Sequence, residues 1–262
     1  MKVLHVWSVA GVAEILAKYM QKVPGVEADV MVRKKFDRFG FNDHPLNDGT
    51  YRYALRAISQ GRRSDVVQVH NWDPIVPWLR RLTGAKVVIS YHNFNIANEW
   101  AARRPRWSKA HARVIATPGL AEMVEGATFI AEPVDTEKFY DEGHHEPGTA
   151  LTSAYSADAE AESLAGEHGL KLTFLRRDTA PVPHSEFPSL LNKFEYYIDI
   201  KRSQGVSNEI VKATGMTCLE ALACGCKVIR WDGKVLQGLP EENRPDVAAG
   251  NYLSLYQSLL SA

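Results

Sequence analysis

The chain alternates between short apolar runs and longer segments whose apolar residues recur every three to four positions. Continuous apolar runs are typical of strands buried on both faces of a parallel sheet, and the 3.6-residue recurrence predicts amphipathic helices. In the first half, strands are predicted at 2–7, 28–32, 65–70, 86–91, 113–117 and 127–131. Helices are predicted after Gly11, over about 50–62, and from Asp73 as N-cap to Leu82.

The second half repeats the pattern on a smaller scale. Strands are predicted at 149–154, 170–175 and 196–200, and helices at 156–164, 185–194 and 248–262. Strands that alternate with helices indicate doubly wound parallel sheets, whose ligands bind at the carboxyl ends of the strands. We therefore expect an N-terminal domain over 1–140, a linker at 141–148, a C-terminal domain over 149–247, and a final helix that packs back onto one of them.

The segment 217–229 reads as a short helix, a glycine stop and a buried strand. Thr217 is predicted to cap the helix after a tight turn at Gly215, and Gly225 stands where a C-cap requires positive φ. Glu220 places a carboxylate in this otherwise apolar helix. It either complements the helix dipole or accepts hydrogen bonds from ligand hydroxyls.

The run LEALACGCKVI around Glu220 resembles the LEAMACGxPVI signature of the retaining group 1 glycosyltransferases of the GT-B fold. The segment EPVDTEKF at 132–139 is similar to the NGVDTExF segment that ends their first domain. The resemblance implies an α/β protein with two Rossmann-like, doubly wound parallel-sheet domains facing across a cleft. The first would be the acceptor side, and the second would bind the nucleotide sugar.

In that family the residue matching Glu220 binds the ribose hydroxyls, and the preceding turn faces the diphosphate and donor sugar. The resemblance thus implies donor contacts from Gly215, Met216 and Thr217, with Val182 in the turn before the nucleobase region. The first strand–helix turn also approaches a ligand in this family. Gly11 is the position carried over, since a full glycine-rich fingerprint is missing.

Two departures from the family affect its catalytic pattern. No basic residue occurs over 153–161, where the family carries an Arg and a Lys that bind the diphosphate. Lys212 stands where the first glutamate of the family's E-x7-E motif is expected. Phosphate charge must then be met elsewhere, and Lys201 and Lys212 are the predicted donor-side cations, with Lys212 given a catalytic role.

Two predicted strands end in His-Asn, at His70 and His92. Both histidines fall at the ligand edge of the predicted sheet, and His92 matches the family histidine near the donor sugar. His92 is therefore predicted as catalytic and His70 as an acceptor-side residue. The segment 93–112 is predicted as a polar, aromatic loop from which Arg103 and Arg106 contact an anionic acceptor.

Composition narrows the remaining function classes. With 31 basic and 31 acidic residues, the net charge of zero predicts no nucleic-acid partner. The three cysteines lack metal-ligand spacing and favour a reducing cytoplasm. The sequence also lacks a D-x-D pair of acidic residues, so a metal-dependent mechanism is not expected. Aromatic and basic residues near 100–109 leave peripheral membrane contact open beside an ordinary solvated helix face.

We thus expect transfer of a sugar from a nucleotide-sugar co-substrate, such as a UDP- or GDP-sugar, to a glycan, lipid or small-molecule acceptor. Retention without a metal or other cofactor is expected, because the leaving diphosphate can itself accept the acceptor proton. One alternative is a degenerate pseudo-enzyme that binds a nucleotide sugar or a partner transferase. Another is a Rossmann-type epimerase or dehydrogenase, which NAD binding would reveal.

Overall fold

A computed structural model describes the chain except for residues 38, 93–95, 154–157, 177–178 and 201–213. The described residues form two compact units. The first comprises Met1–Pro133 and Pro245–Ala262, and the second comprises residues 134–200 and Thr214–Arg244. Within the described part of the chain, no helix has the length and apolar character needed to cross a bilayer.

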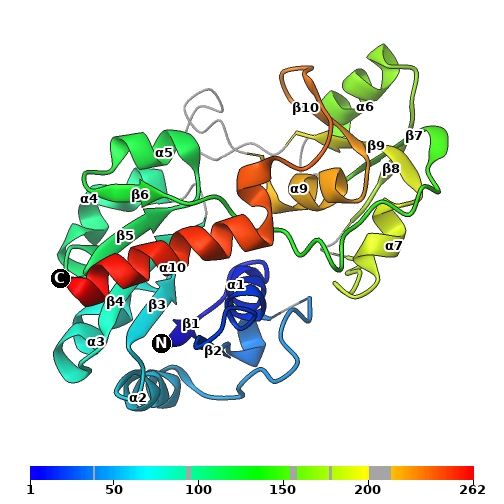
Figure 1. The fold of residues 1–262 in the computed structure, drawn as a ribbon. Coiled ribbons are helices and arrows are strands. Elements are labelled where there is room, and N and C mark those ends of the chain that lie inside the picture. The colour runs from blue at the N-terminus through cyan, green and yellow to red at the C-terminus, as the bar shows by residue number, and fades with distance from the viewer. Residues whose placement is uncertain (38, 93–95, 154–157, 177–178, 201–213) are drawn as a thin grey trace. The chain divides into compact units, whose positions relative to one another are not determined.

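The first unit is built on a parallel sheet of six strands (Figure 1). The strands are β1 (Lys2–Val6), β2 (Glu27–Met31), β3 (Val66–His70), β4 (Lys86–Tyr91), β5 (Ala112–Ile115) and β6 (Ala127–Phe129). Their order is β2-β1-β3-β4-β5-β6, and all five neighbouring pairs are parallel. The winding direction therefore reverses between β1 and β3, the position at which ligands bind in sheets of this order.

One face of this sheet carries the apolar core. Leu4, Val67 and Ile89 are buried there, one on each of the neighbouring strands β1, β3 and β4. The helices α2 (Thr50–Gly61), α3 (Val76–Leu82), α4 (Ile96–Trp107) and α5 (Pro118–Met123) supply the opposing residues. Successive residues of a strand point to opposite faces, so His5 and Gln68, which follow Leu4 and Val67, lie on the other face.

That opposite face holds a buried polar layer covered by the C-terminal helix α10 (Pro245–Ser261) and by α1 (Val12–Met20), as Figure 1 shows for α10. The Gln68 amide donates to Ser90 Oγ at 2.9 Å, and the Tyr252 hydroxyl lies 3.3 Å from the same oxygen. The Tyr256 hydroxyl donates to Gln68 Oε1. All four side chains are fully buried, so these hydrogen bonds replace contacts with water and anchor α10 to the sheet.

The second unit has a five-stranded sheet in the order β11-β10-β9-β7-β8. Its strands are β7 (Glu146–Thr152), β8 (Lys171–Phe174), β9 (Phe194–Asp199), β10 (Lys227–Arg230) and β11 (Val235–Leu236). All pairs are parallel except β10 with β11 at the edge. The helices are α6 (Asp158–Glu167), α7 (Phe187–Leu191) and α9 (Met216–Ala223).

Three single 3-10 turns complete the elements of the described residues. They are η1 (Lys34–Phe36), η2 (Asp73–Ile75) and η3 (Glu241–Asn243).

The expected α/β class with two parallel-sheet units is confirmed, and three local predictions are wrong. The segment predicted as a loop at 93–112 contains helix α4, which tolerates Pro105 in its last turn. Asp73 does not cap a helix: it lies in η2 and its carboxylate is fully buried. Gly215 rather than Thr217 is the N-cap of α9, without a side-chain cap. At Asp73 and in α4, tertiary contacts override local preference, because Asp73 pairs with Tyr91 and Arg103 and Trp107 packs in the core.

Candidate functional site

The carboxyl ends of β1 and β3 carry strained backbone. Trp7 and Ala10 follow β1 with φ of 71° and 51°, and Asn71 follows β3 with φ of 56°. Left-handed φ at a non-glycine residue costs about 1–2 kcal/mol, and such residues gather at functional sites. The strain coincides with the reversal point of the sheet, where a ligand site is expected.

Gly11 ends this first turn and begins helix α1. Its φ is +77°, and a Cβ at this position would lie 2.6 Å from Phe41 Cδ1. The position thus requires glycine both for its backbone and for its close neighbour. The sequence expectation that Gly11 shapes the first strand–helix turn agrees with this geometry; its contact with a ligand stays a prediction.

Three histidines form a chain along the same sheet edge. His5 Nδ1 lies 3.1 Å from His70 Nε2, and His70 Nδ1 lies 2.8 Å from His92 Nε2. His92 Nδ1 lies 3.5 Å from Glu132 Oε1, a distance at which the two are an ion pair only when His92 is charged. Burial lowers the pKa of His5 to about 3 and that of His70 well below its ordinary value, so both rings are neutral.

The carboxylate of Glu132 favours a proton on the facing Nδ1 of His92. His70 then donates from Nδ1 to His92, and His5 donates from Nδ1 to His70, a direction assigned from the network. With this direction of the hydrogen bonds, the buried Nε2 of His5 is an unpaired acceptor, which costs less than an unpaired N–H group would. The Nε2 of His92 is therefore occupied by His70, and its Nδ1 is buried and faces Glu132.

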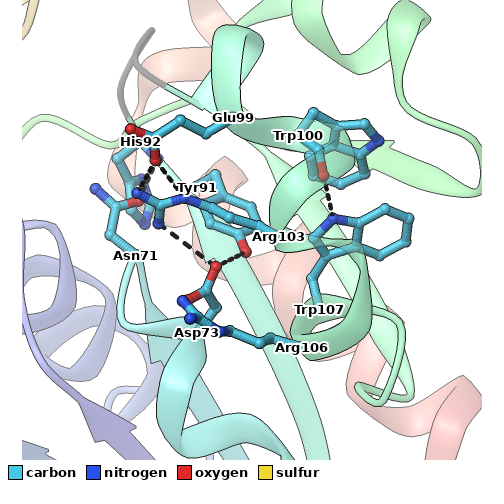
Figure 2. A network of polar contacts seen from close by, with 9 residues as sticks. All are labelled: Asn71, Asp73, Tyr91, His92, Glu99, Trp100, Arg103, Arg106 and Trp107. Carbon is cyan, nitrogen blue, oxygen red and sulfur yellow. Dashed lines mark hydrogen bonds and ion pairs between the residues drawn. The ribbon is translucent and has the colours of Figure 1, made fainter.

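Arg103 and Arg106 lie on α4 and converge on one buried carboxylate, as Figure 2 shows. Arg103 Nη1 is 3.4 Å from Asp73 Oδ2, and Arg106 Nη1 is 3.5 Å from Asp73 Oδ1. The Tyr91 hydroxyl donates to Asp73 Oδ2 at 3.0 Å. Arg103 also pairs with Glu99 one turn earlier. Part of the positive charge predicted for an acceptor is thus used to neutralise Asp73.

The tryptophans of α4 face inward. Trp100 and Trp107 stack with ring centroids 4.1 Å apart, and the Trp107 indole donates to the Trp100 carbonyl at 3.0 Å (Figure 2). Trp107 is 3% exposed. It therefore contributes to the core, and a membrane contact through this helix would depend on its basic residues alone.

In the second unit, the site is organised by Glu220 of α9. His184 lies in the segment between β8 and α7, and its Nε2 lies 3.0 Å from Glu220 Oε1. Lys138 Nζ lies 2.7 Å from Nδ1 of the same ring. An ammonium group only donates, so Nδ1 accepts and the ring carries its proton on Nε2, toward Glu220. His184 and Glu220 are each 5% exposed.

This arrangement holds the carboxylate in one orientation. A carboxylate has about four lone-pair positions, so one bond from His184 uses only part of its acceptor capacity. Gly215, Met216 and Thr217 form the first turn of the same helix. Val182 lies two residues before His184, so the structure brings it into the loop that contacts Glu220. Lys201 and Lys212 lie outside the described residues.

Sequence reasoning missed several residues of these sites: Lys138, His184, His5, Glu132 and Glu14. Lys138 lies within the EKF segment already noted, and His184 follows the Pro-Val-Pro turn, but nothing in the sequence joins them to Glu220. Glu14 accepts from Ser8 and from Asn42 beside the Gly11 turn, and burial raises its pKa. Glu14 is half-buried, and the environment that raises its pKa becomes known only from the structure.

Cys224 and Cys226 supply no reactive thiol. Burial raises the pKa of Cys226 to about 12 and also raises that of Cys224, so both thiols are protonated and unreactive near neutral pH. Among the residues that the structure describes, no group of three or more His, Cys, Asp or Glu side chains is placed to hold a metal ion.

No family model and no curated protein sequence matches the chain. Solved structures do. An alpha-glucosyltransferase in complex with UDP and a 13-mer DNA containing a central A:G mismatch is 12% identical, with a TM-score of 0.63 over 100% of this chain and 90% of that chain. An alpha-glucosyltransferase with UDP-glucose and DNA containing an abasic site gives a TM-score of 0.63 at 11% identity, again over 100% and 90%.

The sucrose-phosphate synthase of Thermosynechococcus elongatus is also similar. It is 11% identical, with a TM-score of 0.52 over 99% of this chain and 90% of that chain. At these identities the likeness establishes the fold, which is the two-unit GT-B fold of glycosyltransferases.

Proposed function

We propose that the chain is a glycosyltransferase that takes a sugar from a nucleotide-sugar donor. The observation that carries the proposal is the buried Glu220, held by His184 on the helix that begins at the Gly215 turn. The GT-B fold, which this chain shares with structures that contain UDP or UDP-glucose, supports the same reading. The sequence resemblance around Glu220 assigns this carboxylate to the ribose hydroxyls.

The proposed mechanism relies on positioning and charge. Glu220 anchors the ribose while the turn at Gly215, Met216 and Thr217 contacts the diphosphate, and Val182 lies toward the base. Lys212 and Lys201 neutralise the leaving diphosphate, which takes the acceptor proton on the same face and so retains the anomeric configuration. Such a step does not itself require a metal ion.

On the acceptor side we propose roles for His92 and its supporting chain. The His92 ring, which His70 holds and which is 8% exposed, borders the proposed position of the transferring sugar. Arg103 and Arg106, beside Asp73, and the strained turn at Gly11 complete the proposed acceptor face. The acceptor classes to be tested are glycans, lipid-linked groups, small molecules and, since two compared structures contain DNA, nucleic acid.

A screen for donor binding tests this proposal. Thermal unfolding of the full chain is measured with UDP-, GDP- and ADP-glucose, with and without Mg²⁺, and with NAD. We expect a rise of several degrees with one nucleotide sugar, since ligand at 100 times its Kd stabilises by about 2.7 kcal/mol. The Glu220→Ala variant should lose that rise, whereas Glu195→Ala, which removes a carboxylate on β9 in the same unit, should keep it.

Three results would contradict parts of the proposal. A rise with NAD alone would replace it by a dehydrogenase or epimerase. A rise with a nucleotide sugar but no release of the nucleoside diphosphate with any acceptor class would leave the pseudo-enzyme. Proton NMR of a formed product reads the anomeric configuration, and an inverted product would refute retention.

A further inference from the structure

Three aromatic rings converge where three neighbouring strands of the first unit end. Phe36 lies in η1 after β2, Trp7 follows β1, and Trp72 follows β3. Trp7 lies between the others: its ring centroid is 5.4 Å from that of Trp72, nearly parallel at 26°, and 4.4 Å from that of Phe36. Trp7 and Trp72 are half-buried and pack on the core, whereas Phe36 is 47% exposed. Core packing therefore does not account for Phe36.

Basic residues surround the exposed ring. Lys34 and Lys35 are exposed on η1 itself, and the Arg33 guanidinium lies 5.2 Å from the Phe36 ring centroid. We call Trp7, Phe36, Trp72, Arg33, Lys34 and Lys35 the aromatic–basic platform. The neighbouring Asp48 is largely covered by ion pairs with two arginines of α2, so it adds little exposed negative charge. The carboxylate of Asp37 accepts the backbone N–H groups of Phe41 and Asn42 within its own loop.

The platform belongs to a part of the chain with a strong charge excess. Residues 1–133 and 245–262 contain 19 Lys and Arg against 13 Asp and Glu, a formal charge of +6. Residues 134–244 contain 12 against 18, a formal charge of −6. The net charge of zero, which predicted no nucleic-acid partner, is thus the sum of two opposite values. A positive field over one unit attracts polyanions to that unit.

We propose that the aromatic–basic platform binds single-stranded or locally unpaired nucleic acid, as the acceptor of the transfer proposed above. A base would stack on Phe36, and Lys34 and Lys35 would contact the flanking phosphates. Stacking rings next to backbone-tracking cations is the combination by which single strands are bound without sequence preference. A neutral glycan would contact the rings but would form no ion pairs with the lysines, and a lipid surface is the competing outcome that the vesicle measurement tests.

The test is fluorescence anisotropy of a fluorescein-labelled 20-nucleotide DNA strand titrated with the full chain between 50 and 300 mM KCl. The ring is removed in Phe36→Ala, with Phe129→Ala as control, because Phe129 is 40% exposed on β6 at the opposite edge of the same sheet. The cations are removed in Lys34→Gln/Lys35→Gln, with Arg63→Gln/Arg81→Gln as control. Those two exposed arginines follow or end the helices α2 and α3, at the opposite end of the sheet.

We expect Phe36→Ala to weaken binding by roughly 5- to 150-fold, the range for one stacked base. The double lysine variant should lower the slope of log K against log salt by about 1.4, since each single-strand phosphate contact contributes about 0.7. Both controls should bind as the unchanged protein does. Thermal unfolding with maltohexaose and cosedimentation with vesicles containing 30% phosphatidylserine, both measured without DNA, test the other acceptor classes.

Two results would overturn the proposal. Binding of maltohexaose or vesicles without binding of the DNA strand would assign the acceptor to another class. DNA binding that the platform variants leave unchanged would place the contact elsewhere. The proposal rests on the glycosyltransferase function, but its failure is separable: the nucleotide-sugar thermal shift of the same preparations depends on Glu220 in the other unit and should survive in every platform variant.

Discussion

The strongest single test of the donor site is removal of the His184 ring. His184 takes a hydrogen bond from Lys138 and donates one to Glu220, so it fixes both the orientation and the surroundings of the carboxylate. His184→Ala removes that donor and leaves Glu220 buried beside an empty space. His184→Gln keeps an amide N–H and a carbonyl oxygen in similar places, and therefore serves as the conservative variant.

The magnitude follows from the contacts. A hydrogen bond to a charged group contributes about 1.5–3 kcal/mol, and leaving a buried carboxylate unsatisfied costs an amount at the upper end of that range. The ring also packs against Phe139, with centroids 5.2 Å apart, so its loss removes about another 1 kcal/mol of packing. We expect His184→Ala to lower the free energy of unfolding by about 3 kcal/mol, and His184→Gln by about half as much.

Urea unfolding and nucleotide-sugar binding measure the two consequences. The control is His145→Ala in the same unit. His145 also pairs with a carboxylate, that of Asp141 at 3.0 Å, and its Nδ1 lies 2.9 Å from the Phe194 carbonyl oxygen, but Asp141 is exposed and such ion pairs contribute under about 1 kcal/mol. For a positioning role, donor affinity should fall in His184→Ala and recover in His184→Gln. Unchanged stability and donor affinity in His184→Ala would refute the reasoning.

Two further predictions concern stability. Gly225→Ala forces a side chain onto φ of +84° and into the Asp141 carboxyl group, and should lower the free energy of unfolding by about 2 kcal/mol or more. The control is Gly49→Ala, at φ of −67° with open space around it, which should leave the free energy of unfolding unchanged. Equal effects of the two substitutions would exclude the steric cause. Stability should also fall as the pH drops from 7.0 to 5.5. Burial lowers the pKa values of His5 and His70, so the unfolded chain takes up protons that the folded protein does not, at about 1.4 kcal/mol per pH unit for each ring below pH 6.5. Denaturant midpoints that stay constant over this range would contradict the buried neutral chain.

Local patterning predicted most elements because each strand and helix is short and strongly periodic. The runs at β1, β3 and β4 are nearly continuous in apolar residues, as strands buried on both faces require. Helix α4 was missed because its Trp, Arg and Pro105 resemble a loop until Trp107 is seen to pack in the core. Propensity is a weak signal where tertiary contacts supply the stability.

Some residues of the candidate site could be predicted from the sequence, and others were found only in the structure. The glutamate helix and the His-Asn strand ends were predicted from the sequence, and the structure places His70 and His92 at the carboxyl ends of β3 and β4 and Glu220 on α9. Their partners were not visible. Lys138, His184 and Glu220 are 46 and 36 positions apart along the chain, and His5 precedes His70 by 65 positions. No local pattern links residues at such separations.

The sequence by itself determined the class of fold, most of the strands and helices, and the glycines that need positive φ, since these depend on periodicity and on backbone sterics within a few residues. Only the tertiary structure decided which polar side chains meet and which are satisfied. It showed that Arg103 and Arg106 share a buried Asp73, and that Trp7, Phe36 and Trp72 come together. The physical reason is that a side chain's charge, tautomer and exposure depend on neighbours that are distant in sequence. Only tertiary packing brings those neighbours within hydrogen-bonding distance.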